Sequence, residues 1–127
     1  MQEKDLFEYA VLRVVPKVER EEFLNVGVVL YCPKPPFLKA LFHLDEQRLK
    51  AFSGNLDVEE IKAYFQAFER ICIGGEGAGP IGKLPIAERF RWLTATRSTV
   101  VQISKVHTGL CANPGAMLEK LYSQLVL

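Results

Sequence analysis

The segment from Phe7 to Val15 carries apolar side chains on both sides of a two-residue repeat. One parity holds Phe7, Tyr9, Val11 and Val15, and the other holds Ala10, Leu12 and Val14. A strand with one face in water would alternate apolar and polar residues, so this pattern predicts an interior strand of a sheet. Pro16 ends it, because proline cannot donate a ladder hydrogen bond. The fold must therefore be built around a sheet.

Three further segments are typical of strands. Asn25 to Cys32 is the second, and Gly27 inside it suits a bulge or a close backbone approach. The sequence PKPP then predicts a turn, so Phe37 to Leu44 is the third strand and is expected to run antiparallel to the second. Thr99 to Val106, rich in β-branched residues, is the fourth.

The clearest predicted helix has one apolar stripe with spacings of three and four residues, formed by Val58, Ile61, Phe65, Phe68 and Cys72. Asp57 and Glu60 resemble a capping box at its start, and Gly74 would end it. Other helices are expected from Asp45 to Phe52, from Pro85 onward, and from an Asn113 cap with Pro114 as first residue. The glycine-rich stretch from Gly74 to Lys83 is expected to be a mobile loop.

This order of elements predicts an α+β fold. We expect a mainly antiparallel four-stranded sheet with helices packed on one face, in the order β-β-β-α-α-α-β-α. The 127 residues suit one domain, residues 1–127, with one core. Hydrophobic residues make up 49% and charged residues 24%, as in ordinary globular proteins.

Location and redox state follow from simple counts. The longest apolar run is far shorter than a membrane span needs, and the N-terminus does not resemble a secretory signal, so we expect a cytoplasmic protein without a membrane segment. Three cysteines, an odd number at wide spacings, argue against a complete disulfide framework. We expect Cys32, Cys72 and Cys111 to be reduced and mostly buried.

The charge distribution favours an anion-binding surface in the C-terminal half. The formal net charge is +1, which argues against a nonspecific nucleic-acid binder, because such binding needs many uncompensated phosphate contacts. Residues 1–72 carry a net charge of −2, whereas residues 73–127 carry +3.

No motif in the chain implies a particular reaction. Gly77 to Lys83 matches G-x-x-x-x-G-K, but Leu84 stands where a phosphate loop needs a hydroxyl residue, and the stretch follows a helix instead of a strand. His107 and Cys111 are too few ligands for a zinc site. A nucleophilic Ser98 or Cys111 with His107 as base lacks both an elbow motif and an orienting carboxylate. We therefore predict no catalytic residue, no metal and no cofactor.

Anion recognition is the better functional interpretation of the basic stretch from Arg89 to Gly109. A guanidinium, two hydroxyls and backbone N–H groups at the start of the fourth strand suit phosphate or carboxylate, and these are Arg97, Ser98 and Thr99. Lys105 and His107 share the parity of Thr99 and would extend this surface. Arg89 and Arg91, two apart on a helix, cannot both join it.

The structural alternative is that these charges are solvated or paired. Arg97 would then pair with an acid of the N-terminal half, and Trp92 would be a core anchor. Arg13, a lone charge on an apolar strand, is open to both interpretations and is included with the anion or partner site. If buried, it needs a partner, and an acid within Glu19 to Glu22 is a candidate.

Two blocks of the chain carry a likeness to a known family. FEYAVLRVVPKVEREEFLNVGVVLYCP and the later ERFRWLTATRSTVVQISKVHTGL resemble the bacterial domain-of-unknown-function family 3037, in order and over nearly the whole chain. Thr96 stands where the resemblance leads us to expect proline. The resemblance implies a small bacterial protein that works with a HipA-like kinase, because genes of the family often neighbour one for such a kinase. The resemblance offers no catalytic residues that could be carried over to this chain.

Three functional hypotheses follow. The first is a non-catalytic binding or regulatory module that partners another protein, such as a HipA-like kinase, and recognises a small anionic ligand or group. The second is a small phosphate-ester hydrolase or nuclease that uses His107 and Arg97. The third is a homo-oligomeric structural protein in which Val26 to Tyr31 supplies an exposed sheet edge. We favour the first.

Overall fold

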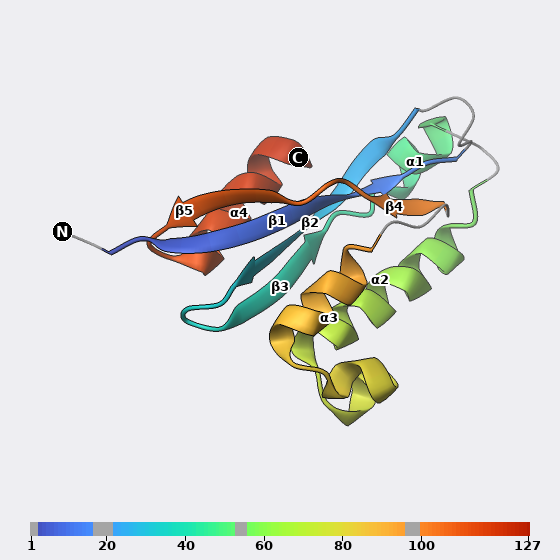
Figure 1. The fold of residues 1–127 in the computed structure, drawn as a ribbon. Coiled ribbons are helices and arrows are strands. Elements are labelled where there is room, and N and C mark those ends of the chain that lie inside the picture. Colours follow the sequence, from blue (N-terminus) through green and yellow to red (C-terminus); the bar gives the residue numbers. More distant parts are fainter. Residues whose placement is uncertain (1–2, 17–21, 53–55, 96–99) are drawn as a thin grey trace.

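The structure is a computed structural model that describes residues 3–16, 22–52, 56–95 and 100–127. A sheet forms its centre, with helices above and below (Figure 1). The strands are β1 (Asp5–Val14), β2 (Leu24–Cys32), β3 (Phe37–Phe42), β4 (Val101–Ile103) and β5 (His107–Cys111). The helices are α1 (Glu46–Phe52), α2 (Val58–Ile73), the 3-10 segment η2 (Glu76–Lys83), α3 (Ile86–Leu93) and α4 (Pro114–Leu125). The α+β class is confirmed.

The sheet is antiparallel throughout, with the strand order β3-β2-β1-β4, and β5 also pairs with β1. As expected for a strand with apolar residues on both faces, β1 lies inside the sheet. The expected edge from Val26 to Tyr31 needs correction, because β2 is also interior, and β3 forms that edge. Sequence parity alone does not say which strand is outermost.

In its described part, the expected fourth strand from Thr99 to Val106 contains only β4, and β5 begins at His107, beyond its expected end, so β5 was not predicted. Leu12 faces Ile103 and Tyr9 faces His107. Between these pairs, two residues of β1 lie opposite three residues of the segment that joins β4 to β5. Ser104 fills this break: its N–H donates to the Val11 carbonyl (2.9 Å), and its Oγ accepts from the Val11 N–H (2.8 Å). The buried backbone of β1 therefore stays hydrogen-bonded where the ladder is interrupted.

Helices cover both faces of the sheet, which corrects the expectation that all would pack on one face. Alternate residues of β1 and β2 belong to two separate apolar clusters: one lies under α2 and α3, and the other under α4. Val28, Leu30 and Cys32 form part of the second cluster. Because these side chains are as apolar as those on the first face, they too need a covering layer, and α4 supplies it.

The local signals at the helix ends are confirmed. Asp57 accepts a hydrogen bond from the Glu60 N–H (3.2 Å), and Asn113 accepts one from the Ala116 N–H (3.1 Å). Gly74 follows α2 with a φ of 82°, a conformation that favours glycine. Pro85 immediately precedes α3.

The stretch expected to be a mobile loop is instead folded into the 3-10 turns of η2. The Gly75 N–H donates to the Gly82 carbonyl (2.9 Å), which closes the segment on itself. A Cβ at Gly82 would collide with the Gly75 carbonyl and the Ala78 side chain, so glycine here serves close packing.

Gly27 has both of the roles expected of it. The β1–β2 register shifts between Leu12 and Arg13, which leaves an additional residue of β2 beside Gly27. A Cβ on Gly27 would lie 2.8 Å from the Phe42 ring, so its absence lets that ring pack against the sheet. Phe42 in turn stacks on Phe65 of α2, with ring centroids 4.5 Å apart.

Candidate functional site

The predicted anion site is only partly covered by the structure. Arg97, Ser98 and Thr99 lie outside the described residues. Three members of the predicted set are described, and they are Arg13, Lys105 and His107. Their positions on the sheet decide which of them can act together.

Arg89 has a structural role at the C-terminal end of α2. Its Nη1 donates to the carbonyls of Ile71 (2.7 Å) and Cys72 (2.9 Å), and its Nε donates to the carbonyl of Leu84 (3.0 Å). A guanidinium here also suits the negative end of the helix dipole. The missing side chain of Gly74 makes this possible, because a Cβ there would lie 2.7 Å from Nη1 of Arg89.

Arg91 is held by an acid on the sheet. Both of its Nη atoms donate to the carboxylate of Glu8, each at 3.1 Å. The pair links α3 to β1 on the face covered by α2 and α3. Neither Arg89 nor Arg91 is therefore available as the principal charge of an anion site.

Lys105 and His107 were expected to share a face because they have the same parity, but the break between β4 and β5 interrupts the alternation on which this depends. Val101 and Ile103 pack with the cluster beneath α2 and α3, whereas His107 stacks on Tyr9, which packs against the cluster under α4. The ring centroids of Tyr9 and His107 are 5.2 Å apart. Residues of equal parity on either side of Ser104 thus face opposite sides of the sheet. Lys105 is exposed.

Arg13 lies on the same face as His107, toward the other end of β1. Its guanidinium carbon is 4.2 Å from the centroid of the Phe23 ring, a cation–π contact. Its Nε is buried, and no hydrogen-bond partner for it lies within the described ranges. Of the acids expected as partners, those at 19 and 21 fall outside these ranges.

Two polar side chains flank Arg13 on neighbouring strands. Asn25 of β2 and Gln102 of β4 are its cross-strand partners, so all three point to the same face. Asn25 Nδ2 donates to the Leu125 carbonyl (3.1 Å), whereas its buried Oδ1 lacks a partner among the residues described. We call Arg13, Asn25 and Gln102 the Arg13 cluster. The sequence pattern missed Asn25 and Gln102, because only the strand register brings them beside Arg13.

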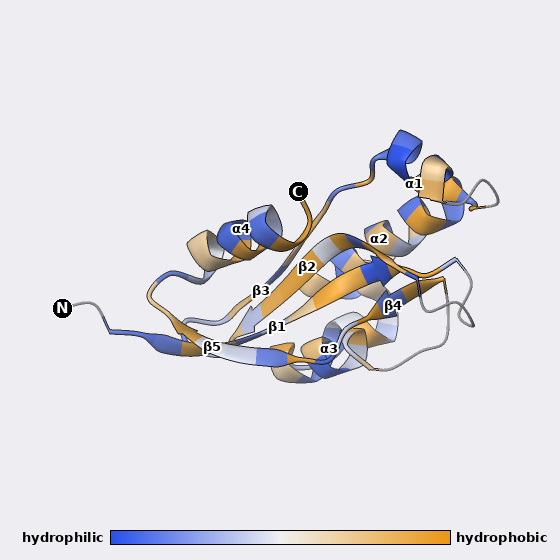
Figure 2. Cartoon of the chain, turned by 90° about the horizontal axis from the view of Figure 1, so that it is seen from above, coloured by the Kyte–Doolittle hydropathy of each residue, from blue (hydrophilic) through white to orange (hydrophobic). Residues whose placement is uncertain are grey.

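The Arg13 cluster and His107 are separate sites. Arg13 is four positions along β1 from Tyr9, the residue on which His107 stacks. Because a strand rises about 3.3 Å per residue, Arg13 and Tyr9 are about 13 Å apart. One phosphate group cannot touch both. The helix α4 packs against β2 and β3, and in Figure 2 it lies on the β2–β3 side of the sheet.

The cysteines are free and buried, as expected. Burial raises the pKa of the Cys72 thiol to about 12, so this group is protonated at neutral pH. No cluster of three potential metal ligands occurs in the described part of the chain. Within the same residues, no helix is long and apolar enough to cross a membrane.

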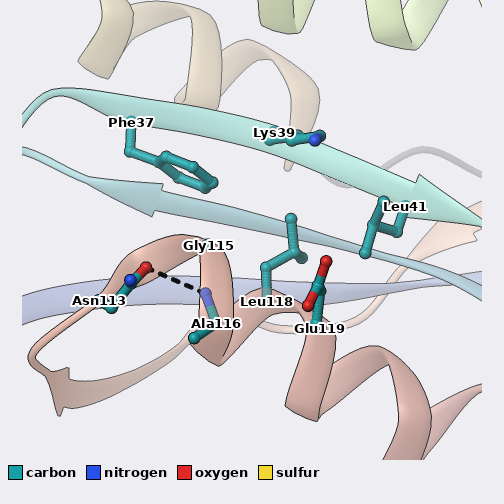
Figure 3. A pocket seen from close by; sticks show the side chains of 8 residues that line it. All are labelled: Phe37, Lys39, Leu41, Asn113, Gly115, Ala116, Leu118 and Glu119. Carbon is teal, nitrogen blue, oxygen red and sulfur yellow. Dashed lines mark hydrogen bonds between the residues drawn. The ribbon is translucent and has the colours of Figure 1, made fainter.

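Two hollows flank β3, the edge strand, and sequence reasoning did not find them. The first, of 310 Å³, lies between β3 and the start of α4 (Figure 3). The second, of 410 Å³, lies between β3 and the end of α2. They become visible only when the strand order and both helix layers are known. Lining the first are Phe37, Lys39, Leu41, Asn113, Gly115, Ala116, Leu118 and Glu119.

Comparison with known proteins identifies the family. No curated protein and no solved structure matches the chain. One family model, described as "Protein of unknown function (DUF3037)", matches residues 9–126, nearly the whole chain. The match includes β1 from Tyr9 onward, the Arg13 cluster and α4. The chain therefore belongs to the DUF3037 family.

Proposed function

We propose that this protein is a non-catalytic binding or regulatory module that recognises an anionic group at the Arg13 cluster and works with a protein partner. One observation carries the proposal. The buried Nε of Arg13 and the buried Oδ1 of Asn25, on neighbouring strands, both lack hydrogen-bond partners in the described part of the chain. A buried donor and a buried acceptor left unpaired each cost about 1–3 kcal/mol, and a ligand that pairs both removes this cost.

The two unpaired groups define the ligand chemistry. Arg13 offers N–H donors to a phosphate or carboxylate oxygen, in the forked geometry that guanidinium groups use for such anions. Asn25 Oδ1 needs a donor, which a P–OH group or an N–H beside a carboxylate supplies. Gln102, on the other side of Arg13, adds an amide that can both donate and accept.

The sequence supports two extensions of this surface. Val100 accepts a hydrogen bond from the Val15 N–H (2.7 Å), two residues along from Arg13. Arg97, Ser98 and Thr99 precede Val100 in the chain and are proposed, from sequence, as further anion or partner contacts. Lys105 and His107, about 13 Å away by strand geometry, are proposed as contacts to a larger partner instead of to the same anion.

The family resemblance supports a protein as that partner. Genes of the family often neighbour one for a HipA-like kinase. This association comes from gene neighbourhood, so direct binding is the decisive measurement.

The anion proposal is tested by an amide NMR titration with inorganic phosphate. We expect shifts centred on Arg13, Asn25 and Gln102 in the wild type, and their loss in Arg13→Gln. Arg91→Gln is the matched control, because it removes the same charge from an arginine already paired with Glu8. Equal titration of wild type and Arg13→Gln would contradict the proposal.

The partner proposal is tested with a purified HipA-like kinase from the protein's own host. We expect one complex by size-exclusion chromatography, weakened by combined Lys105→Ala and His107→Ala substitutions and, separately, by Arg97→Ala. Absence of a complex at micromolar concentrations would remove the kinase as partner without touching the phosphate result.

A further inference from the structure

The outer edge of β3 presents backbone groups that, apart from the Phe42 carbonyl, pair with no described residue. The His43 N–H donates to the Val26 carbonyl (2.8 Å), which makes these two residues a hydrogen-bonded pair of the β2–β3 ladder. Such pairs alternate along antiparallel strands, so Phe37, Lys39 and Leu41 bond to β2. The N–H and C=O groups of Leu38, Ala40 and Phe42 therefore point away from the sheet. The Phe42 carbonyl accepts from the Tyr122 hydroxyl (3.1 Å), as this direction requires.

Apolar surface lies beside this edge on both faces. The hollow next to α4 is floored by Phe37, Leu41 and Leu118. The hollow next to α2 includes Ile73, which is 74% exposed. A strand added to this edge would place alternate side chains beside the two hollows. An open edge with apolar flanks is what strand addition uses.

We propose that a second copy of this chain occupies the edge, with β3 pairing antiparallel to β3 of the other copy around a two-fold axis at Ala40. The two Ala40 residues then exchange N–H and C=O bonds, and Leu38 of each copy pairs with Phe42 of the other. The Phe42 carbonyl can accept both bonds, because it has two lone pairs. This pairing extends the antiparallel sheet continuously across both copies.

The other registers are poorer. Centring the axis on Lys39 places two lysines directly opposite each other, which is repulsive. Centring it on Leu38 sets Ala40 opposite Pro36, which has no N–H to donate. Centring it on Leu41 leaves the outward groups of Leu38 beyond the end of the partner's β3. Only the Ala40 register uses every outward group of the strand.

Charge complementarity favours the same register. Lys39 of each copy falls opposite Leu41 of the other, on the face covered by α4. Glu119 rises from α4 beside Leu41 and lines the same hollow (Figure 3). Each Lys39 ammonium thus meets the Glu119 carboxylate of the other copy, and the contact occurs twice by symmetry. Within one chain, neither side chain makes an ion pair or a hydrogen bond with another described residue.

Sedimentation velocity across protein concentrations up to about 1 mM tests the proposal. We expect a species of twice the 14.3 kDa chain mass. Lys39→Glu and Glu119→Lys should each weaken the dimer about tenfold or more, and the double variant should recover most of that loss. Lys120→Glu is the matched control, because it makes the same charge change on α4 without lining the hollow.

Ala40→Pro supplies an independent measurement. It removes an N–H that bonds to no described residue, and an edge strand tolerates proline at such a position, so the fold should persist by circular dichroism while the dimer is lost. A monomer at every concentration, a dimer indifferent to Ala40→Pro, or a double charge variant no better than the single ones would each overturn the proposal. Binding of some other extended peptide to a monomeric wild type would do the same.

Discussion

The two faces of the sheet differ in what covers them and in what remains unpaired. The face under α2 and α3 is covered by an apolar cluster that includes stacked rings of Tyr31 and Phe90, 5.2 Å apart. The face under α4 is apolar beneath that helix and polar beyond it, at the Arg13 cluster. The two buried side-chain polar atoms that lack a partner among the described residues, Arg13 Nε and Asn25 Oδ1, both lie on this second face. We infer that the first face mainly supplies stability and the second supplies recognition.

The largest expected effect is on the first face. Phe90→Ala should lower the free energy of unfolding by about 3–5 kcal/mol, because Phe90 is fully buried and its removal leaves a cavity against Tyr31. Guanidinium unfolding followed by circular dichroism measures it. Trp92→Ala on the same helix is the control and should cost clearly less, since Trp92 is 43% exposed.

A smaller loss of stability is expected when an apolar side chain under α4, on the second face, is truncated. Leu118→Ala should cost about 2–4 kcal/mol, because Leu118 is the buried centre of the contact between α4 and the sheet. The same unfolding measurement applies. A loss of stability larger than that of Phe90→Ala would contradict the inference that the first face is the main source of stability.

The next largest loss of stability is expected at Ser104, in the break between β4 and β5. Ser104→Ala should cost about 1–3 kcal/mol, because the buried Val11 N–H loses its acceptor. Hydrogen exchange at the Val11 amide should accelerate in parallel. Thr108→Ala, at an exposed position of β5, serves as the control and should change stability by no more than about 0.5 kcal/mol.

The smallest effect is expected at the Arg13 cluster. Arg13→Met should be nearly neutral or slightly stabilising, because it retains an apolar stem over Phe23 and removes a buried donor without a partner. Thermal unfolding without added anions measures it. A loss above about 2 kcal/mol would show that Arg13 stabilises the fold and would weaken its assignment to recognition.

The parts of the fold that depend on neighbouring residues were predictable. The caps at Asp57 and Asn113, the end of α2 at Gly74 and the bulge at Gly27 all follow from local chemistry. The 3-10 turns from Glu76 to Lys83 were missed, because glycine content indicates freedom of the backbone and not whether contacts remove it. The two-residue alternation fails between Ile103 and His107, because one additional residue near Ser104 exchanges the two faces.

The candidate site was predictable only in part. Arg13 attracted attention as a lone charge on an apolar strand, and the structure places it beside Asn25 and Gln102. Nothing in the local sequence links Arg13 to Gln102, 89 residues later, because cross-strand neighbours are set by register. Likewise, Arg89 and Arg91 resemble site residues in the sequence. Their structural roles become clear only from their partners, a backbone carbonyl for Arg89 and the Glu8 carboxylate for Arg91.

The sequence by itself determined the α+β class, the interior position of β1 and most helix boundaries. These depend on residue periodicity and on capping groups within a few residues of each other, so they need no knowledge of the remaining chain. The tertiary structure alone decided that α4 covers the second face, that β3 is an open edge and that Arg13 lies between two amides. Each of these features depends on pairing between segments far apart in the chain. The contacts that stabilise such pairing are not encoded in the local sequence pattern.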